Sequence, residues 1–213
     1  MSAWDDVASA FDSGRVALAR LRQVHGSNVI VRRAGDAHDV TALPDADIVV
    51  SDDPSLVLAI QTADCVPILM GDARTGAVAA AHAGWRGLAS RVPHAAVRAM
   101  AEHFGARPED VTAALGPSIS AARYEVGAEV RNRFEREFSS KQTALWFPVQ
   151  TREGHWQFDG WISAIDQLIA AGLSPERVHA SRLCTAEQRE LFCSYRRDGV
   201  AAGRLAAAIR ARG

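Results

Sequence analysis

The stretch from Gln61 to Gly87, QTADCVPILMGDARTGAVAAAHAGWRG, constrains the fold of this chain more than any other. It contains two short apolar runs, VPILM directly after Cys65 and residues 77–81 directly before His82. Short runs rich in Val, Ile, Leu and Ala that stop at polar or turn residues are typical of buried strands. Each run therefore predicts a buried strand that carries a chemically useful side chain to the edge of a sheet, where ligand sites are often built.

Strand-like and helix-like segments alternate along the rest of the chain. The predicted strands are residues 16–24, 28–32, 47–51, 56–61, 111–115, 124–126 and 177–181, and the predicted helices are residues 4–12, 88–104, 127–138 and 159–171. Pro93 predicts a kink or a fresh start inside the second helix. The alanine-rich residues 201–210 fit a strand or a helix, because such runs are ambiguous. This interleaving indicates a layered α/β or α+β domain with mixed strand pairing.

Composition limits the function classes that need to be considered. With 213 residues, 48% of them hydrophobic and 23% charged, the chain can bury a core of ordinary size, and we expect one domain over residues 1–213. The net charge of −1 gives no bulk attraction to nucleic acid or to an anionic membrane surface. No apolar run approaches the roughly 18 residues that span a bilayer, and the N-terminus lacks a basic signal region. We therefore expect a soluble, cytoplasmic monomer or homodimer whose partners are small molecules.

His25, Cys65 and His82 are residues of the metal-ligand type at the ends of apolar strands. Neutral imidazole and thiolate suit zinc, and three protein ligands leave a fourth tetrahedral position for water or substrate. The three residues are 40 and 17 positions apart, so only the fold can bring them together. Ordinary core packing is the alternative for each of them. The chain has three cysteines, an odd number that indicates no disulfide framework and leaves a metal-binding or catalytic role open.

Other polar residues near these strands are candidates for catalysis or for binding an anion. In a regular strand Asp64 and Cys65 point to opposite faces. If the backbone turns there, the carboxylate of Asp64 is a candidate acid/base or a partner of a metal-bound histidine. The alternative is that Asp64 caps a turn. Arg86 follows a predicted strand-to-helix junction and adds positive charge there. Arg196 and Arg197 are adjacent, so in a strand one of them faces inward and requires an anionic partner.

Several motifs in order resemble the YfiH family, also called the laccase-domain or polyphenol oxidase family. They are QVHG at 23–26, TADCVP at 62–67, HAGWRG at 82–87, LGP at 115–117, YEVG at 124–127, CT at 184–185 and SYRRDG at 194–199. The resemblance implies an α+β fold with mixed sheets in α/β/β/α layers, similar to the catalytic domain of cytotoxic necrotizing factor toxins. It also implies that this chain lacks the usual N-terminal segment of the family.

The same resemblance implies a metal site. Carried over motif by motif, His25, Cys65 and His82 hold a zinc ion, with copper as the alternative metal. Members of the family are associated with phosphorolysis of adenosine, inosine, guanosine and methylthioadenosine, and with deamination of adenosine. We therefore expect a zinc-dependent purine nucleoside phosphorylase with adenosine deaminase activity.

In that reaction Arg86, together with Arg196 or its neighbour Arg197, is expected to hold phosphate. Asp64 is the candidate for moving protons during deamination. Both assignments follow from the expected activity and from the charge of these side chains.

Three alternatives compete with this interpretation. A copper-dependent, laccase-like polyphenol oxidase is one, although three scattered ligands are too few for a multicopper centre. A cysteine hydrolase or amidase acting on peptidoglycan precursors would use Cys65 as nucleophile and His82 as base. A zinc-stabilised module without activity would need a fourth protein ligand, for which Cys184, His38 and His94 are available.

Overall fold

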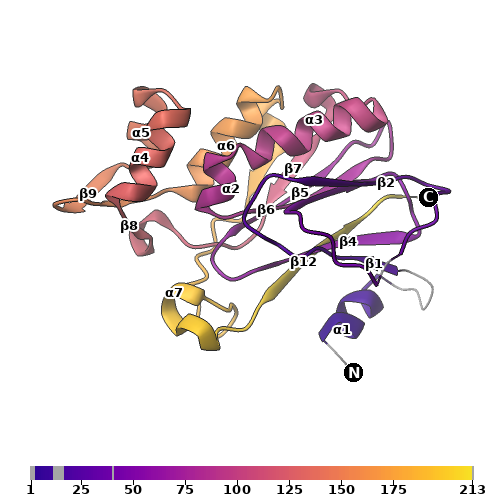
Figure 1. Cartoon of the computed structure of the whole chain (residues 1–213), viewed down its shortest axis with the longest axis horizontal. Coiled ribbons are helices and arrows are strands. Elements are labelled where there is room, and N and C mark those ends of the chain that lie inside the picture. Colours follow the sequence, from indigo (N-terminus) through magenta and orange to yellow (C-terminus); the bar gives the residue numbers. More distant parts are fainter. Residues whose placement is uncertain (1–2, 12–16, 40, 213) are drawn as a thin grey trace.

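The central layer of the protein is a mixed six-stranded sheet (Figure 1). The structure is a computed structural model that describes residues 3–11, 17–39 and 41–212. The strand order is β11-β7-β5-β6-β3-β2. The strands are β2 (Val29–Arg32), β3 (Ile48–Ser51), β5 (Val66–Gly71), β6 (Val78–Ala83), β7 (Thr112–Leu115) and β11 (Val178–Ala180). The inner pairings are antiparallel, whereas β2 and β11 pair in parallel with β3 and β7 at the two edges. The predicted mixed pairing is thereby confirmed.

A second sheet packs on one face of the first. It has the order β1-β4-β12 and consists of β1 (Ala17–Ala19), β4 (Leu56–Thr62) and β12 (Leu205–Arg210). The interface between the sheets is apolar and contains Leu56, Leu58, Ile60, Val49, Val78 and Ala80. All six residues of β6 are buried because both of its faces are covered, which explains why that strand reads as an unbroken apolar run.

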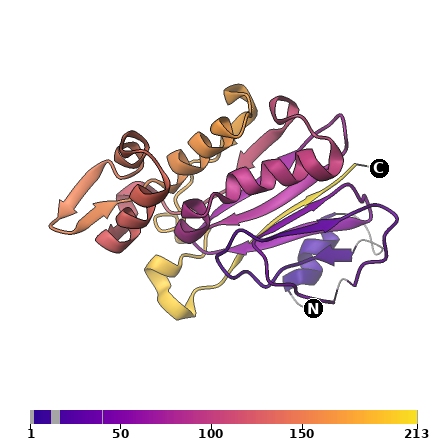
Figure 2. The same cartoon turned by 45° about the horizontal axis from the view of Figure 1, so that its top comes forward.

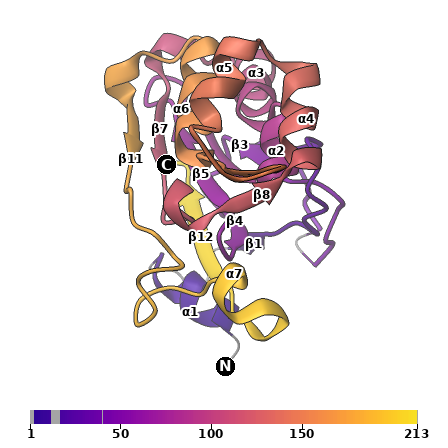
Figure 3. The same ribbon diagram turned by 90° about the vertical axis from the view of Figure 1, so that its left-hand side faces the viewer.

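Helices cover the other face of the six-stranded sheet. They are α2 (Trp85–Ala89), α3 (Val92–Phe104) and α6 (Gly160–Ala170), and Figure 2 shows the magenta α3 and the orange α6 lying across the sheet. Helix α1 (Ala3–Ser9) lies on the opposite side of the molecule, beyond the smaller sheet, as Figure 3 shows. The resulting order of helices, sheet, sheet and helix agrees with the expected α+β layering.

The helix predicted over residues 88–104 is two helices, so the fresh start is the correct alternative. Arg91 adopts a left-handed conformation with φ 61° and separates α2 from α3. Pro93 lies in the first turn of α3, where its missing N–H has no helical partner to lose. Gly105, with φ 66°, ends α3 and donates its N–H to the carbonyl of Ala101.

A small antiparallel sheet and two helices project at one side of the molecule, at the left of Figure 1. They are β8 (Glu125–Gly127), β9 (Val149–Arg152), β10 (His155–Gln157), α4 (Ala128–Glu137) and α5 (Ser140–Trp146). Phe134 holds this part together through ring contacts with Phe138, Trp146, Phe147 and Phe158. The sequence prediction contained neither α5 nor the β9-β10 hairpin. The capping box formed by Ser139 and Gln142 is the signal that marks the start of α5.

The C-terminal part of the chain ends in an edge strand of the smaller sheet. The short helix α7 (Tyr195–Asp198) precedes β12, which pairs antiparallel with β4 from Leu205 opposite Thr62 to Arg210 opposite Val57. Residues 205–210 are therefore a strand, and the helical alternative for this alanine-rich run is wrong. Of the strand predicted over residues 16–24, only Ala17–Ala19 is a strand, and residue 16 lies outside the described residues. Across the described ranges, none of the helices has the length and apolarity that crossing a bilayer requires.

Candidate functional site

The antiparallel pairing of β5 and β6 brings two of the predicted metal ligands together. Cys65 directly precedes β5 and His82 lies near the end of β6, where Pro67 is paired with His82. His25 comes from the loop between β1 and β2, in a left-handed conformation with φ 59°. The ligand atoms of His25, Cys65 and His82 all lie within 4.8 Å of one another. Two imidazoles and one thiolate at this spacing could hold a single ion such as zinc or copper.

Gly84 keeps space open beside this His-Cys-His cluster. A Cβ atom at Gly84 would lie 2.9 Å from Sγ of Cys65 and 3.1 Å from Cδ2 of His25. The backbone of Gly84 has φ −73° and ψ 176°, which any residue can adopt. Glycine is therefore needed here for the room it leaves beside the two side chains. A gap that even a methyl group would close is consistent with a small group held between the ligands.

Asp47 orients two residues of the cluster, His25 and His82, and was not among the residues predicted from the sequence. Its fully buried carboxylate lies 2.8 Å from Nδ1 of His82. It also accepts backbone N–H bonds from Val24, His25 and Gly26 at 3.2, 3.1 and 2.6 Å. The first contact leaves Nε2 of His82 for a metal, and the others fix the loop that carries His25. An acidic residue opening the apolar run of β3 was the signal available in the sequence.

The surroundings of Cys65, His82 and Asp47 favour the charged form of each of these three groups. Burial raises the pKa of the Cys65 thiol, but hydrogen bonds and charge from His25 and His82 outweigh this effect and lower the pKa to about 7. Burial lowers the pKa of His82, but Asp47 and Cys65 more than compensate and raise it to about 9. Asp47 has a pKa below its ordinary value, because its bonds to His82 and Gly26 outweigh the effect of burial. A thiolate is thus accessible near neutral pH, as a metal ligand or a nucleophile requires.

The cluster lines a cavity of about 710 Å³. The wall contains three aromatic residues and four arginines besides the cluster: Trp85, Tyr124, Tyr195, Arg22, Arg86, Arg196 and Arg204. Arg22 forms an ion pair with Asp45, whereas the other three arginines form no ion pair with a carboxylate anywhere in the described ranges. The cavity therefore favours anionic ligands.

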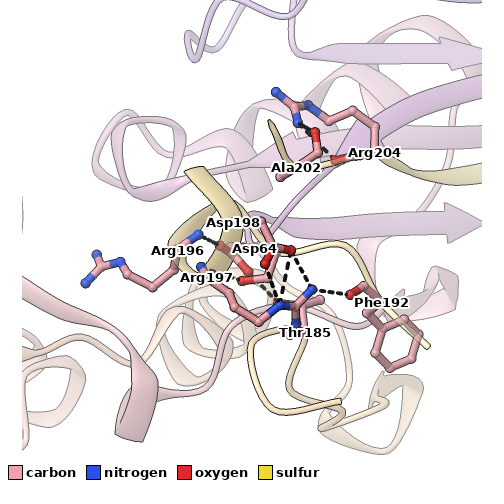
Figure 4. Close-up of polar contacts among 10 residues, drawn as sticks. Asp64, Thr185, Phe192, Arg196, Arg197, Asp198, Ala202 and Arg204 are labelled. Carbon is pink, nitrogen blue, oxygen red and sulfur yellow. Dashed lines mark hydrogen bonds and ion pairs between the residues drawn. The ribbon is translucent and has the colours of Figure 1, made fainter. Parts of the chain in front are cut away.

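Asp64 lies at the cavity, and the backbone turns there with φ 81°. Its carboxylate does not point freely at the cluster. One oxygen accepts a 2.6 Å bond from Oγ1 of Thr185 and the other a 2.6 Å bond from the backbone N–H of Arg196 (Figure 4). The turn that sequence reasoning required is present, whereas the acid/base role of Asp64 stays a prediction.

The structure separates the two adjacent arginines by what they contact. Arg196 lines the cavity, and its guanidinium donates to the carbonyl of Glu125 at 2.9 Å and lies 5.1 Å from the ring centre of Tyr124. Arg197 donates to the carbonyls of Thr185 and Phe192, each at 2.9 Å. These residues are in α7, so the premise that they belong to a strand is wrong. Figure 4 shows the two arginine side chains pointing in different directions.

Arg86 occupies the predicted junction between a strand and a helix, because β6 ends at Ala83 and α2 begins at Trp85. Its guanidinium lies 4.5 Å from the ring centre of Trp85 at the cavity. No further His, Cys, Asp or Glu completes the metal cluster in the part of the chain that the structure describes. Of the suggested fourth ligands, Cys184 accepts a bond from the N–H of Ser120, and His38 contacts the carbonyl of Arg33. The cluster is thus of the open, three-ligand kind.

Comparison with known proteins places this geometry in a family. Residues 2–212 match the family model described as "Multi-copper polyphenol oxidoreductase laccase". The chain belongs to this laccase-domain family. Relatives in the family include "Purine nucleoside phosphorylase" of Bacteroides thetaiotaomicron, 34% identical over 195 residues, which are 88% of this chain and 70% of that protein. "Purine nucleoside phosphorylase YfiH" of Escherichia coli K12 is 36% identical over 192 residues, which are 89% of this chain and 72% of that protein.

Solved structures of the laccase-domain family share the fold. The crystal structure of the Bacillus licheniformis hypothetical protein YfiH superimposes with a TM-score of 0.89 at 29% identity, over 97% of this chain and 79% of that one. The resemblance to the YfiH family and the α+β fold with several mixed sheets are confirmed. The family description also supports a metal at the His-Cys-His cluster, without identifying the element.

Proposed function

We propose that this laccase-domain protein is a metal-dependent purine nucleoside phosphorylase. Its substrates would be adenosine, inosine, guanosine or methylthioadenosine, with deamination of adenosine as a second reaction in the cytoplasm. The observation that carries the proposal is that an open His-Cys-His cluster lies on the wall of an arginine-lined cavity of about 710 Å³. The relatives named purine nucleoside phosphorylase support the reaction class.

His25, Cys65 and His82 would hold the metal, and their donor atoms suit zinc better than magnesium or calcium. When bound, zinc supplies Lewis acidity and lowers the pKa of a water molecule toward about 7. Asp47 keeps His82 in the orientation that leaves Nε2 for the ion, since the carboxylate lies at Nδ1. Copper is the alternative metal, because imidazole and thiolate also bind copper.

Phosphorolysis requires a phosphate oxygen to attack C1′ of the ribose while the bond from C1′ to the purine breaks. Arg86 and Arg196 are the cavity arginines that can hold the phosphate, because guanidinium groups match its oxygens geometrically and electrostatically. They would also keep its charge close to the positive charge that develops on the sugar. The aromatic rings of Trp85, Tyr124 and Tyr195 offer apolar surface for the purine.

The decisive experiment is incubation of the pure protein with adenosine, with and without inorganic phosphate, followed by product analysis. Adenine and ribose 1-phosphate are expected only when phosphate is present, and inosine is expected in either case. Cys65→Ala should abolish metal uptake and both products, whereas Cys184→Ala, a matched change at a buried cysteine outside the cavity, should retain them. Phosphorolysis by a metal-free Cys65→Ala protein would exclude the metal-dependent reaction.

Two other functions are each favoured by a specific observation. The description of the family favours a copper-dependent polyphenol oxidase, which would contain copper and oxidise phenols. The lowered pKa of Cys65 beside His82 favours a cysteine hydrolase or amidase, which would be metal-free and sensitive to thiol alkylation. Metal analysis of the purified protein separates the three functions, because the phosphorylase proposal expects about one zinc ion per cluster.

A further inference from the structure

The carboxylate of Asp64 connects the metal-ligand strand to the C-terminal wall of the cavity. Asp64 immediately precedes Cys65, and both residues line the cavity. Its hydrogen-bond donors, Thr185 and Arg196, are 121 and 132 positions further along the chain. A single buried side chain therefore joins two parts of the site that are remote in sequence.

The segment that Asp64 contacts is held in place by a connected set of bonds. Thr185 is fully buried; its hydroxyl donates to Asp64 and its carbonyl accepts from Arg197. The bridge between Ser118 and Cys184 holds the start of the segment next to the loop after β7. Figure 4 shows Asp64 at the centre of these contacts, between Thr185 and α7.

Arg196 is fixed at two points as a result. Its backbone N–H donates to Asp64, and its guanidinium donates to the carbonyl of Glu125 and lies over the ring of Tyr124. Without the first bond, the backbone of Arg196, an exposed residue of a four-residue helix, is held only through its neighbours, such as Arg197 with its bonds to Thr185 and Phe192. Asp64 thus controls where the backbone of Arg196 lies relative to the cluster.

We propose that Asp64 is a positioning residue, which holds residues 185–197 against the metal-ligand turn so that Arg196 faces the anion in the cavity. Its role is to accept two hydrogen bonds and not to carry a proton. The geometry favours this role because both carboxylate oxygens already accept short bonds, and only 9% of the residue is exposed. The identity of the anion as phosphate rests on the proposed function, whereas the positioning role does not.

Asp64→Asn and Asp64→Ala separate positioning from proton transfer. The amide oxygen of Asn can accept from the N–H of Arg196, while its NH₂ group donates to Oγ1 of Thr185, whose hydroxyl can turn to become the acceptor. Asn therefore keeps both bonds but cannot act as an acid or a base. Ala loses both bonds and is also strained at φ 81°, a conformation that Asn tolerates, so Thr185→Val, which leaves the backbone at Asp64 unchanged, is measured alongside. Positioning predicts that Asn rescues most of what Ala loses, whereas proton transfer predicts that both variants lose turnover alike.

The measurements are steady-state kinetics with varied phosphate and hydrogen exchange of the peptides that cover residues 185–197. We expect Asp64→Ala to lower kcat/KM for phosphate by about 10- to 100-fold, mainly through KM, because a misplaced Arg196 binds phosphate less tightly. The same variant should exchange faster in residues 185–197 and still bind zinc through its unchanged ligands. Asp64→Asn should keep a kcat/KM for phosphate within about threefold of the native value, a ratio that corresponds to less than 1 kcal/mol.

Two results would overturn the proposal: native exchange rates in Asp64→Ala, or a kcat/KM for phosphate in Asp64→Asn as low as that of Asp64→Ala. If Asp64→Ala does not fold, Thr185→Val provides the test, because it removes one donor and keeps the shape of the side chain. Faster exchange in residues 185–197 of that variant would then support positioning, and native exchange would overturn it. If the native protein shows no phosphorolysis, the proposed function fails, and hydrogen exchange still decides the role of Asp64.

Discussion

Gly84→Ala should weaken metal binding strongly without unfolding the protein. The new Cβ would lie 2.9 Å from Sγ of Cys65 and 3.1 Å from Cδ2 of His25. An ordinary contact of this kind requires about 3.5–4.0 Å, so the sulfur must move by roughly 0.6 Å or more. Cys65 can make that movement only by turning away from the position that it shares with His25 and His82.

The size of the effect follows from the narrow tolerance of a metal site. A zinc–sulfur bond is about 2.3 Å long and tolerates deviations of about 0.2 Å, so the displaced thiolate is lost as a ligand or strained. We expect zinc affinity to fall by at least about 100-fold, which corresponds to about 2.7 kcal/mol. Backbone strain should not destabilise the metal-free protein, since Ala accepts φ −73°. Ala also lowers the conformational entropy of the unfolded chain, which raises the free energy of unfolding by about 0.4–1 kcal/mol.

Competition with a chromophoric zinc chelator measures the affinity, and thermal melting in a chelator measures the metal-free fold. Gly71→Ala is the matched control, because a Cβ there would approach nothing more closely than 3.9 Å, at Cγ1 of Val78. It should leave zinc affinity unchanged. Native zinc affinity in Gly84→Ala would refute the reasoning, since the cluster would then not hold the ion beside Gly84.

The other predictions concern the groups around the cluster. Asp47→Asn should weaken zinc binding by about 10- to 100-fold in chelator competition, because the residue loses the charge that orients His82, and native affinity would contradict this. In metal-free protein, alkylation of Cys65 by iodoacetamide should rise as the pH passes about 7, because His25 and His82 lower the pKa of the thiol against the effect of burial. Peptide mass spectrometry would follow this reaction with Cys193 as reference, and a midpoint near the ordinary value of 9.0 would count against it. Arg86→Ala should raise the KM for phosphate by about 10-fold or more and that for nucleoside far less, whereas equal effects would remove Arg86 from the phosphate site.

Local patterns were sufficient for the elements that create the metal cluster. The apolar runs of β5 and β6 could be recognised because both faces of these strands are covered, so that nearly every position is buried. Cys65 and His82 could be named as candidates because each one interrupts such a run. Residues 88–104 were predicted as one helical segment, but Arg91 adopts a left-handed conformation that separates two helices. The residue at this position is not a glycine, so the sequence carries no signal for that conformation.

Other contacts could not be found from local patterns, because they join distant parts of the chain. The sequence predicted Asp47 only as the first residue of a strand. In the tertiary structure β6 and the loop at His25 both approach it, so that its carboxylate contacts His82 and accepts the backbone N–H of His25. The short helix α7 gave Arg196 and Arg197 different surroundings that strand alternation could not describe. Hydrogen-bond partners more than a hundred residues away leave no local pattern.

The sequence by itself determined which residue types were available for chemistry and which strands were buried, because hydrophobic periodicity and turn residues act over a few positions. The tertiary structure decided which of those residues meet. Antiparallel pairing of β5 and β6 places Cys65 beside His82, and the turn at Asp64 directs a carboxylate toward residues 185–197. Both depend on how the layers pack, which is a property of the whole chain.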